Sequence, residues 1–150
     1  MEHSYYMNEA LKEAYKAYDK NETPIGAIIV KDDIIISRAH NLRETLKDPT
    51  AHAEIFAIKE AAKILGGLRL MNCTMYITME PCVMCTGAII ESRIKNIVIG
   101  TKHIKNKDSE KNLNQKLYYF NNNNIKINIG ILEEQCSNIL KMFFKDLRRK

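Results

Sequence analysis

The sequence predicts an α/β fold, a three-layer α/β/α sandwich around a central mixed, largely parallel sheet. Two observations support this prediction. Strand-like and helical segments alternate between residues 53 and 100, which is typical of parallel strands covered by helices on both faces. Before them, Ala27–Val30 and Ile34–Ile36 are apolar runs joined by Asp32-Asp33, a pattern that predicts a β-hairpin and therefore a mixed sheet.

The elements before residue 70 follow from apolar spacing and from residues that end helices. Apolar side chains recur at helical spacing from Ser4 to Asp19, which predicts a first helix. After the hairpin, the polar stretch Asn41–Thr50 is expected to form a loop. The next helix should cover Ala53–Leu65, because Gly66-Gly67 would end it.

The second half continues the alternation. The expected elements, in chain order, are strand Thr74–Thr78, helix Cys82–Ser92, strand Asn96–Gly100, a short helix ending at Phe120, edge strand Ile125–Ile129 and a closing helix from Glu133 to about Arg149. The pattern is weak over Lys102–Asn114, and the asparagines at 121–124 are expected to form a turn.

Length and composition favour one globular domain over residues 1–150. Hydrophobic residues make up 45% of the chain and charged residues 27%, which is ordinary for such a domain. The first six residues lack the features of a signal peptide, and no apolar run approaches the ~20 residues of a membrane span. We expect a soluble, cytoplasmic protein with no membrane partner. A net charge of +5 fits either an acidic partner or a merely basic surface.

Two short motifs together predict a catalytic zinc site. His52 offers an imidazole, and Cys82 and Cys85 offer two thiols that share a face at three-residue spacing. Pro81 suits the first position of a helix, so both thiols should lie in its first turn, where the helix dipole favours thiolates. A catalytic zinc takes three protein ligands and keeps the fourth position for water. We expect one Zn²⁺ per subunit.

Glu54 lies two positions after His52 and is not needed as a ligand. At the N-terminal end of the helix beginning at Ala53, both side chains could reach a pocket beyond the helix end. Zinc lowers the pKa of bound water from about 15.7 toward about 7, and Glu54 could carry a proton from that water to the ring and to departing ammonia. The sequence therefore predicts a hydrolase that converts C–NH₂ to C=O.

Each motif alone has a simpler explanation. Cys-x-x-Cys also occurs as a redox motif, and His-x-Glu is most often a pair of surface residues. For Cys73 and Cys136 we expect buried apolar thiols. If either closed the zinc shell, the protein would be a structural zinc protein that binds nucleic acid.

Longer motifs resemble a known family. Pro24-Ile25-Gly26-Ala27, Asp48–Glu54 and Glu80–Ala88 are similar to the cytidine-deaminase-like superfamily. Within it, the chain most resembles the bacterial tRNA adenosine deaminases, which make inosine at the anticodon wobble position. The resemblance extends over nearly the whole chain, including Gly130–Glu134.

The resemblance implies roles for particular residues. His52, Cys82 and Cys85 would bind zinc, and hydroxide on that zinc would attack C6 of a flipped adenine with Glu54 as proton shuttle. The residues implied to contact the base or the RNA are Asn41, Pro24, Ile25, Ala53, Met79, Lys105, Phe143, Phe144 and Arg148. Asn41 could instead cap its loop, and core packing is an alternative for Pro24, Ile25 and Met79.

The C-terminus supports an RNA partner, by resemblance a tRNA anticodon stem-loop. Residues 141–150 contain five basic residues and one acid, a balance of +4, with Phe143 and Phe144 among them. Exposed aromatics can stack on unpaired bases while cations meet phosphates. The alternative is that the Phe pair closes the core.

One position departs from the family pattern. Where bacterial tRNA deaminases usually have Asp before the Lys matched by Lys105, this chain has His103. The resemblance implies that this position faces the nucleotide beside the target. His103 could instead touch a phosphate or ribose, or be a solvated loop histidine. A free-base or nucleoside deaminase, acting on guanine or cytosine, shares the zinc motif and is a second hypothesis. By resemblance we also expect a homodimer in which each subunit shapes its partner's groove.

Overall fold

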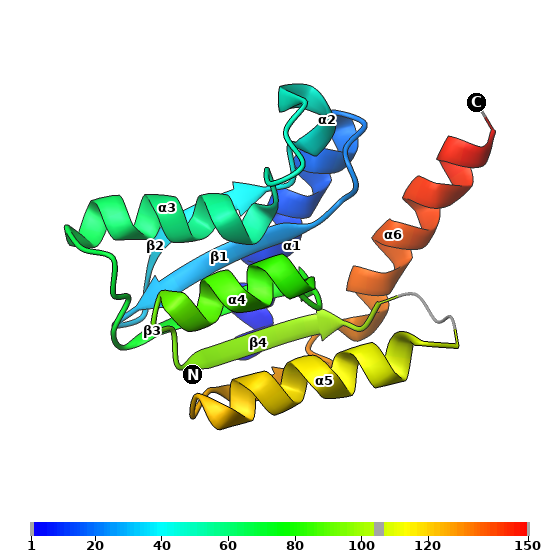
Figure 1. The fold of residues 1–150 in the computed structure, drawn as a ribbon. Coiled ribbons are helices and arrows are strands. Elements are labelled where there is room, and N and C mark those ends of the chain that lie inside the picture. Colours follow the sequence, from blue (N-terminus) through cyan, green and yellow to red (C-terminus); the bar gives the residue numbers. More distant parts are fainter. Residues whose placement is uncertain (1, 104–106, 150) are drawn as a thin grey trace.

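The fold was examined in a computed structural model that describes residues 2–103 and 107–149. Its centre is a five-stranded sheet with the order β2-β1-β3-β4-β5 (Figure 1). The strands are β1 Gly26–Lys31, β2 Ile34–His40, β3 Cys73–Met79, β4 Asn96–Thr101 and β5 Lys126–Ile129. β3, β4 and β5 pair in parallel, whereas β1 is antiparallel to both β2 and β3. Only β1 runs against the others, so the mixed, largely parallel sheet is confirmed.

Helices cover both faces of the sheet and complete three layers (Figure 1). The helices are α1 His3–Asp19, α2 Arg43–Leu46, α3 Ala53–Leu65, α4 Val83–Glu91, α5 Ser109–Asn122 and α6 Glu133–Arg148. α1 and α6 pack with Ile28, Tyr76 and Val98 on one face. α3, α4 and α5 pack with Ile29 and Ile77, among others, on the opposite face. Successive side chains of each buried strand point to opposite faces of the sheet, as the two-residue period of a strand requires.

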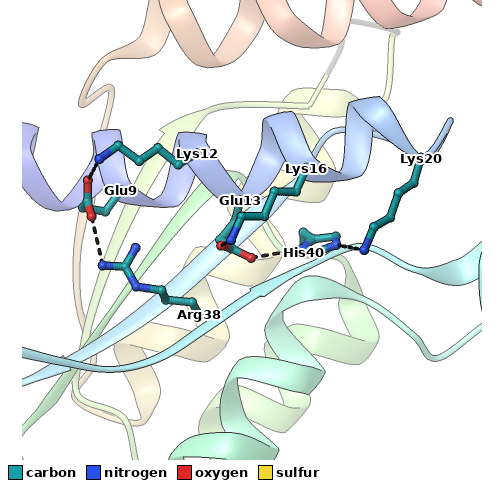
Figure 2. Close-up of polar contacts among 7 residues, drawn as sticks. All are labelled: Glu9, Lys12, Glu13, Lys16, Lys20, Arg38 and His40. Carbon is teal, nitrogen blue, oxygen red and sulfur yellow. Dashed lines mark hydrogen bonds and ion pairs between the residues drawn. The ribbon is translucent and has the colours of Figure 1, made fainter.

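Gly26 allows α1 to lie against the start of β1. A Cβ at this position would overlap the carbonyl oxygen of Ala10 and lie 2.6 Å from the backbone nitrogen of Ala14. Polar contacts fix the same helix to β2 (Figure 2). Buried Glu9 pairs with Arg38 at 2.9 Å, and buried Glu13 accepts from His40 Nδ1 at 2.9 Å.

Most element boundaries match the sequence predictions, and Gly66 ends α3 in the left-handed conformation (φ +73°) as expected. Three details differ. Cys82 is the N-cap of α4, so Pro81 precedes the helix and is not its first residue. The expected loop 41–50 contains the short helix α2, and α5 spans 14 residues where the sequence predicted only a short helix.

A helix long and apolar enough to cross a membrane is absent from the part of the chain that the structure describes.

Candidate active site

The three predicted zinc ligands meet where two helices begin. His52 is the N-cap of α3, Cys82 is the N-cap of α4, and Cys85 lies in the first turn of α4. His52 Nδ1 lies 3.7 Å from Cys82 Sγ and 3.5 Å from Cys85 Sγ. Within the described residues, these three form the one His/Cys/Asp/Glu group whose ligand atoms all lie within 4.8 Å of one another. The meeting of two helix N-termini at one metal site is confirmed.

This geometry fits zinc. Zinc–sulfur bonds of about 2.3 Å and a zinc–nitrogen bond of about 2.0 Å, at tetrahedral angles, separate N and S ligand atoms by about 3.5 Å. The observed distances of 3.5 and 3.7 Å agree, and they identify Nδ1 as the ligand atom of His52. Cys73 and Cys136 are buried and do not belong to the group. Both behave as the apolar thiols expected from the sequence.

The two ligand thiols differ in their affinity for a proton. A hydrogen bond with Cys85 is the main cause that lowers the pKa of Cys82 to about 5, and backbone N–H groups at the start of α4 act in the same direction. The same hydrogen bond, followed by burial, raises the pKa of Cys85. Cys82 is therefore prepared as a thiolate, while Cys85 releases its proton when a metal binds.

Glu54 is the buried acid of the site. Its side chain is on the first turn of α3, the residue is 3% exposed, and burial raises its pKa to about 7. A hydrogen bond with the Cys85 thiol opposes this effect, which also places Glu54 beside the ligands. A carboxyl group with a pKa near neutrality can both accept and donate a proton at physiological pH.

The residues implied to contact the base gather in two places. Asn41 follows β2, and its backbone N–H donates to the Ile25 carbonyl at 3.2 Å, beside buried Pro24. The Asn41 side chain donates to Thr23 O and accepts from the Arg43 N–H, so a loop-capping role is observed. Ala53 begins α3 and Met79 ends β3, and both are buried.

The residues implied to contact RNA differ in how exposed they are. Phe143 is 8% exposed and packs edge-on against Tyr18, with ring centroids 5.9 Å apart. Its predicted stacking on RNA therefore has no support in this chain, because the ring fills a space between α6 and α1. Phe144 is half-buried and Arg148 is exposed. Lys105 lies outside the described residues.

Comparison with known proteins assigns the family. A family model described as the cytidine and deoxycytidylate deaminase zinc-binding region matches residues 1–101. The chain belongs to this family. That range contains all three zinc ligands and Glu54, so the resemblance seen in the sequence and the expectation of one zinc ion per subunit are confirmed.

Individual relatives show which deaminases this chain is similar to. The chain is 46% identical over 145 residues to the tRNA-specific adenosine deaminase of Bacillus subtilis (strain 168), covering 97% of this chain and 90% of that protein. A structure from a study of A-to-I editing by tRNA:A34 deaminases at the wobble position has a TM-score of 0.80 at 35% identity, covering 91% of this chain and 99% of that one. The structure of a guanine deaminase from Bacillus subtilis has a TM-score of 0.66 at 40% identity, and the match covers 69% of this chain and 66% of that one.

Three side chains near this deaminase site had no role in the sequence predictions. Glu22 is fully buried, and its carboxylate accepts from the N–H groups of Glu44 and Thr45 at the start of α2. Glu80 and Lys116 form a buried ion pair at 2.6 Å beside the α4 N-terminus. Glu80 stands in the zinc motif, but nothing in the sequence pairs it with a lysine 36 positions later in a polar segment.

Proposed function

We propose that this protein hydrolyses adenosine to inosine at the wobble position, 34, of tRNA anticodons. The observation that supports this most directly is the His52-Cys82-Cys85 cluster beside buried Glu54, in a chain that matches tRNA-specific adenosine deaminases over nearly its whole length. In this proposal residues 1–150 form one deaminase domain that acts in the cytoplasm.

Glu54 is the proton carrier of the proposed reaction. His52, Cys82 and Cys85 would hold the zinc ion, which would lower the pKa of water and so supply a nucleophile near neutral pH. Glu54 takes one proton from that water and delivers it to a ring nitrogen of the adenine, where it stays. Glu54 then carries the second proton, from the attacking oxygen that becomes the C6 carbonyl, to the amine that leaves. The balance is adenosine plus water to inosine plus ammonia. Burial of Glu54 keeps bulk water from competing for this proton.

Asn41, Pro24 and Ile25 form the proposed base site. A base inside a stacked helix cannot present its ring to buried groups such as Glu54, so the target must be unstacked and turned outward. Besides its loop-capping contacts, the Asn41 amide has a second N–H and a second oxygen lone pair that it can offer to the base. Pro24 and Ile25 offer an apolar wall. Their shared position around the Asn41–Ile25 hydrogen bond supports this assignment. Ala53 and Met79 complete the wall nearest to the metal.

We assign the anticodon stem-loop to the surface around the α6 C-terminus. Lys145 and Arg148 are exposed there and can meet phosphates, and Phe144 is the aromatic with a partly open ring. His103, exposed in the segment after β4, stands where the family has Asp and is assigned to the nucleotide beside the target. Lys105 is proposed as an RNA contact from the family resemblance alone.

We also propose a homodimer, because α4 has an exposed apolar face beside the site. Val83 is 78% exposed and Met84 38%. One turn later is Gly87, where a Cβ would have no neighbour within 4 Å, which allows another helix to approach closely. Apolar exposure of this kind favours a protein interface. A partner placed there would border the metal site.

Guanine deamination is the second candidate, because a guanine deaminase shares the fold and 40% identity. Ammonia release from an anticodon stem-loop with adenosine at the wobble position should be compared with release from guanine, cytosine and adenosine. We expect turnover of the RNA alone, with a KM that rises steeply with salt because RNA binding releases counterions. Turnover of guanine, insensitive to salt, would contradict the proposal in favour of the second candidate.

A further inference from the structure

The β3–α4 turn, which delivers Cys82 to the metal site, is held by a buried lysine from a different part of the chain. Lys116 lies on α5 and is 7% exposed. Its Nζ donates to the Pro81 carbonyl oxygen at 2.9 Å and lies 2.6 Å from a Glu80 carboxylate oxygen. Both contacts fall on the two residues immediately before the ligand Cys82.

Glu80 extends this contact to two further segments. Its backbone N–H donates to the carbonyl of Thr101 at the end of β4, at 2.9 Å. Its second carboxylate oxygen accepts from the His103 N–H at 2.6 Å. Glu80 therefore connects the turn before α4 to three other parts of the chain. These are the end of β4, the segment after β4 and, through Lys116, α5.

Local chain structure alone does not fix this turn. Pro81 has no N–H to donate, and Cys82 makes no side-chain capping hydrogen bond for α4. Burying an ammonium and a carboxylate costs free energy that hydrophobic packing would avoid. Stability therefore does not explain why a charged pair occupies this position.

We propose that Lys116 is a positioning residue for the zinc site. Its ammonium fixes the Pro81 carbonyl and the Glu80 carboxylate, and so holds Cys82 Sγ within reach of His52 and Cys85. The site is then assembled before the metal arrives, and the metal is retained more strongly once bound. Groups that orient metal ligands in this way commonly change metal affinity by about 10- to 100-fold.

Zinc retention in Lys116→Met tests this role, with Lys95→Met as matched control. Lys95 also donates to a main-chain carbonyl, that of Asn123 at 2.8 Å, but it lies before β4, at the end away from Glu80. The melting temperature of each variant would be measured first. At a temperature where all variants are folded, we would then measure zinc transfer to a chromophoric chelator. On the anticodon stem-loop, kcat and KM would be measured at the same temperature. Lys116→Met should lose zinc at least about tenfold faster, with a lower kcat and an unchanged KM. Lys95→Met should match the wild type.

A Lys116→Met protein with a lower melting temperature but wild-type zinc retention would overturn the proposal, because the ion pair would then be merely structural. If that variant does not fold, Glu80→Gln removes the charge partner while keeping an acceptor for the His103 N–H. Glu80→Gln should also lose zinc faster, and wild-type retention would overturn the proposal. Chelator competition needs no substrate, so its result is independent of which base the enzyme deaminates.

Discussion

His52 and Cys82 occupy helix N-caps, positions where Ser, Thr, Asp or Asn would normally stabilise a helix. Neither makes a side-chain capping hydrogen bond, so both helices give up that stabilisation in exchange for a metal ligand. The spacing of these ligands could be predicted from the sequence, because three-residue spacing and a helix start are local properties. The contact between Lys116 and Glu80 could not, because it depends on how α5 packs.

Replacing Glu54 with Gln should separate catalysis from metal binding. The amide has nearly the same volume but cannot carry a proton, so kcat should fall by about 10²- to 10⁴-fold while zinc content stays unchanged. Inosine formation and metal analysis would measure the two effects. An active Glu54→Gln enzyme would contradict the proton-carrier role.

Single replacements of the four cysteines distinguish a catalytic from a structural zinc. Cys82→Ala and Cys85→Ala should lose zinc, because each removes one of three ligands. Cys73→Ala and Cys136→Ala are the matched controls and should retain one equivalent. Loss of zinc from either control would indicate a fourth protein ligand and a closed, structural site.

At the scale of elements, the regular apolar patterns predicted α1, α3 and the buried strands closely. α5 was underestimated because only Leu113, Lys116 and Phe120 of its 14 residues are buried, and one of these is charged. Pro81 was predicted at the first position of the helix but lies two residues before it, because the metal ligand Cys82 takes the N-cap and Val83 is the first helical residue. Phe143 shows the same limit, since the sequence could not decide whether it faces RNA or Tyr18.

The α1–β2 contact should make stability depend on acid pH. The hydrogen bond with His40 is the main cause that lowers the Glu13 pKa to about 2, from about 4.3 in an unfolded chain. The stabilisation is therefore complete above about pH 4.3 and is lost as the pH falls toward 2. Glu13→Gln should lower the free energy of unfolding by about 1.5–3 kcal/mol at pH 7, and by less as the pH approaches 2.

Urea unfolding at several pH values would measure this difference. Glu134→Gln, at an exposed position on α6, is the control and should behave as wild type. A Glu13→Gln deficit that stays constant from pH 7 to pH 2 would show that the lowered pKa does not contribute.

The exposed face of α4 should control association. Gly87→Arg adds a bulky charge where nothing lies within 4 Å of a Cβ, so a single chain should tolerate it. In sedimentation at micromolar concentration we expect a dimer for the wild type and a monomer for Gly87→Arg. Gly67→Arg, also in open space, is the matched control and should remain dimeric. A monomeric wild type would contradict the dimer proposal.

At the scale of the whole molecule, α3 and α4 begin at the same end of the sheet (Figure 1). The parallel strands β3 and β4 also end there. Ligand sites of open α/β sheets form at the carboxyl ends of strands. This end of the sheet therefore brings together the metal ligands, Glu54 and His103. Fold class and metal chemistry were predictable from the sequence, whereas the proposed RNA surface depends on how α6 leaves the sheet.

The most direct test is to locate inosine by mass spectrometry after zinc-loaded protein has acted on an arginine tRNA with adenosine at position 34. We expect inosine at position 34 alone, and none with the Glu54→Gln enzyme. Unmodified tRNA, together with ammonia release from guanine or a free nucleoside, would contradict tRNA editing while leaving the zinc site in place.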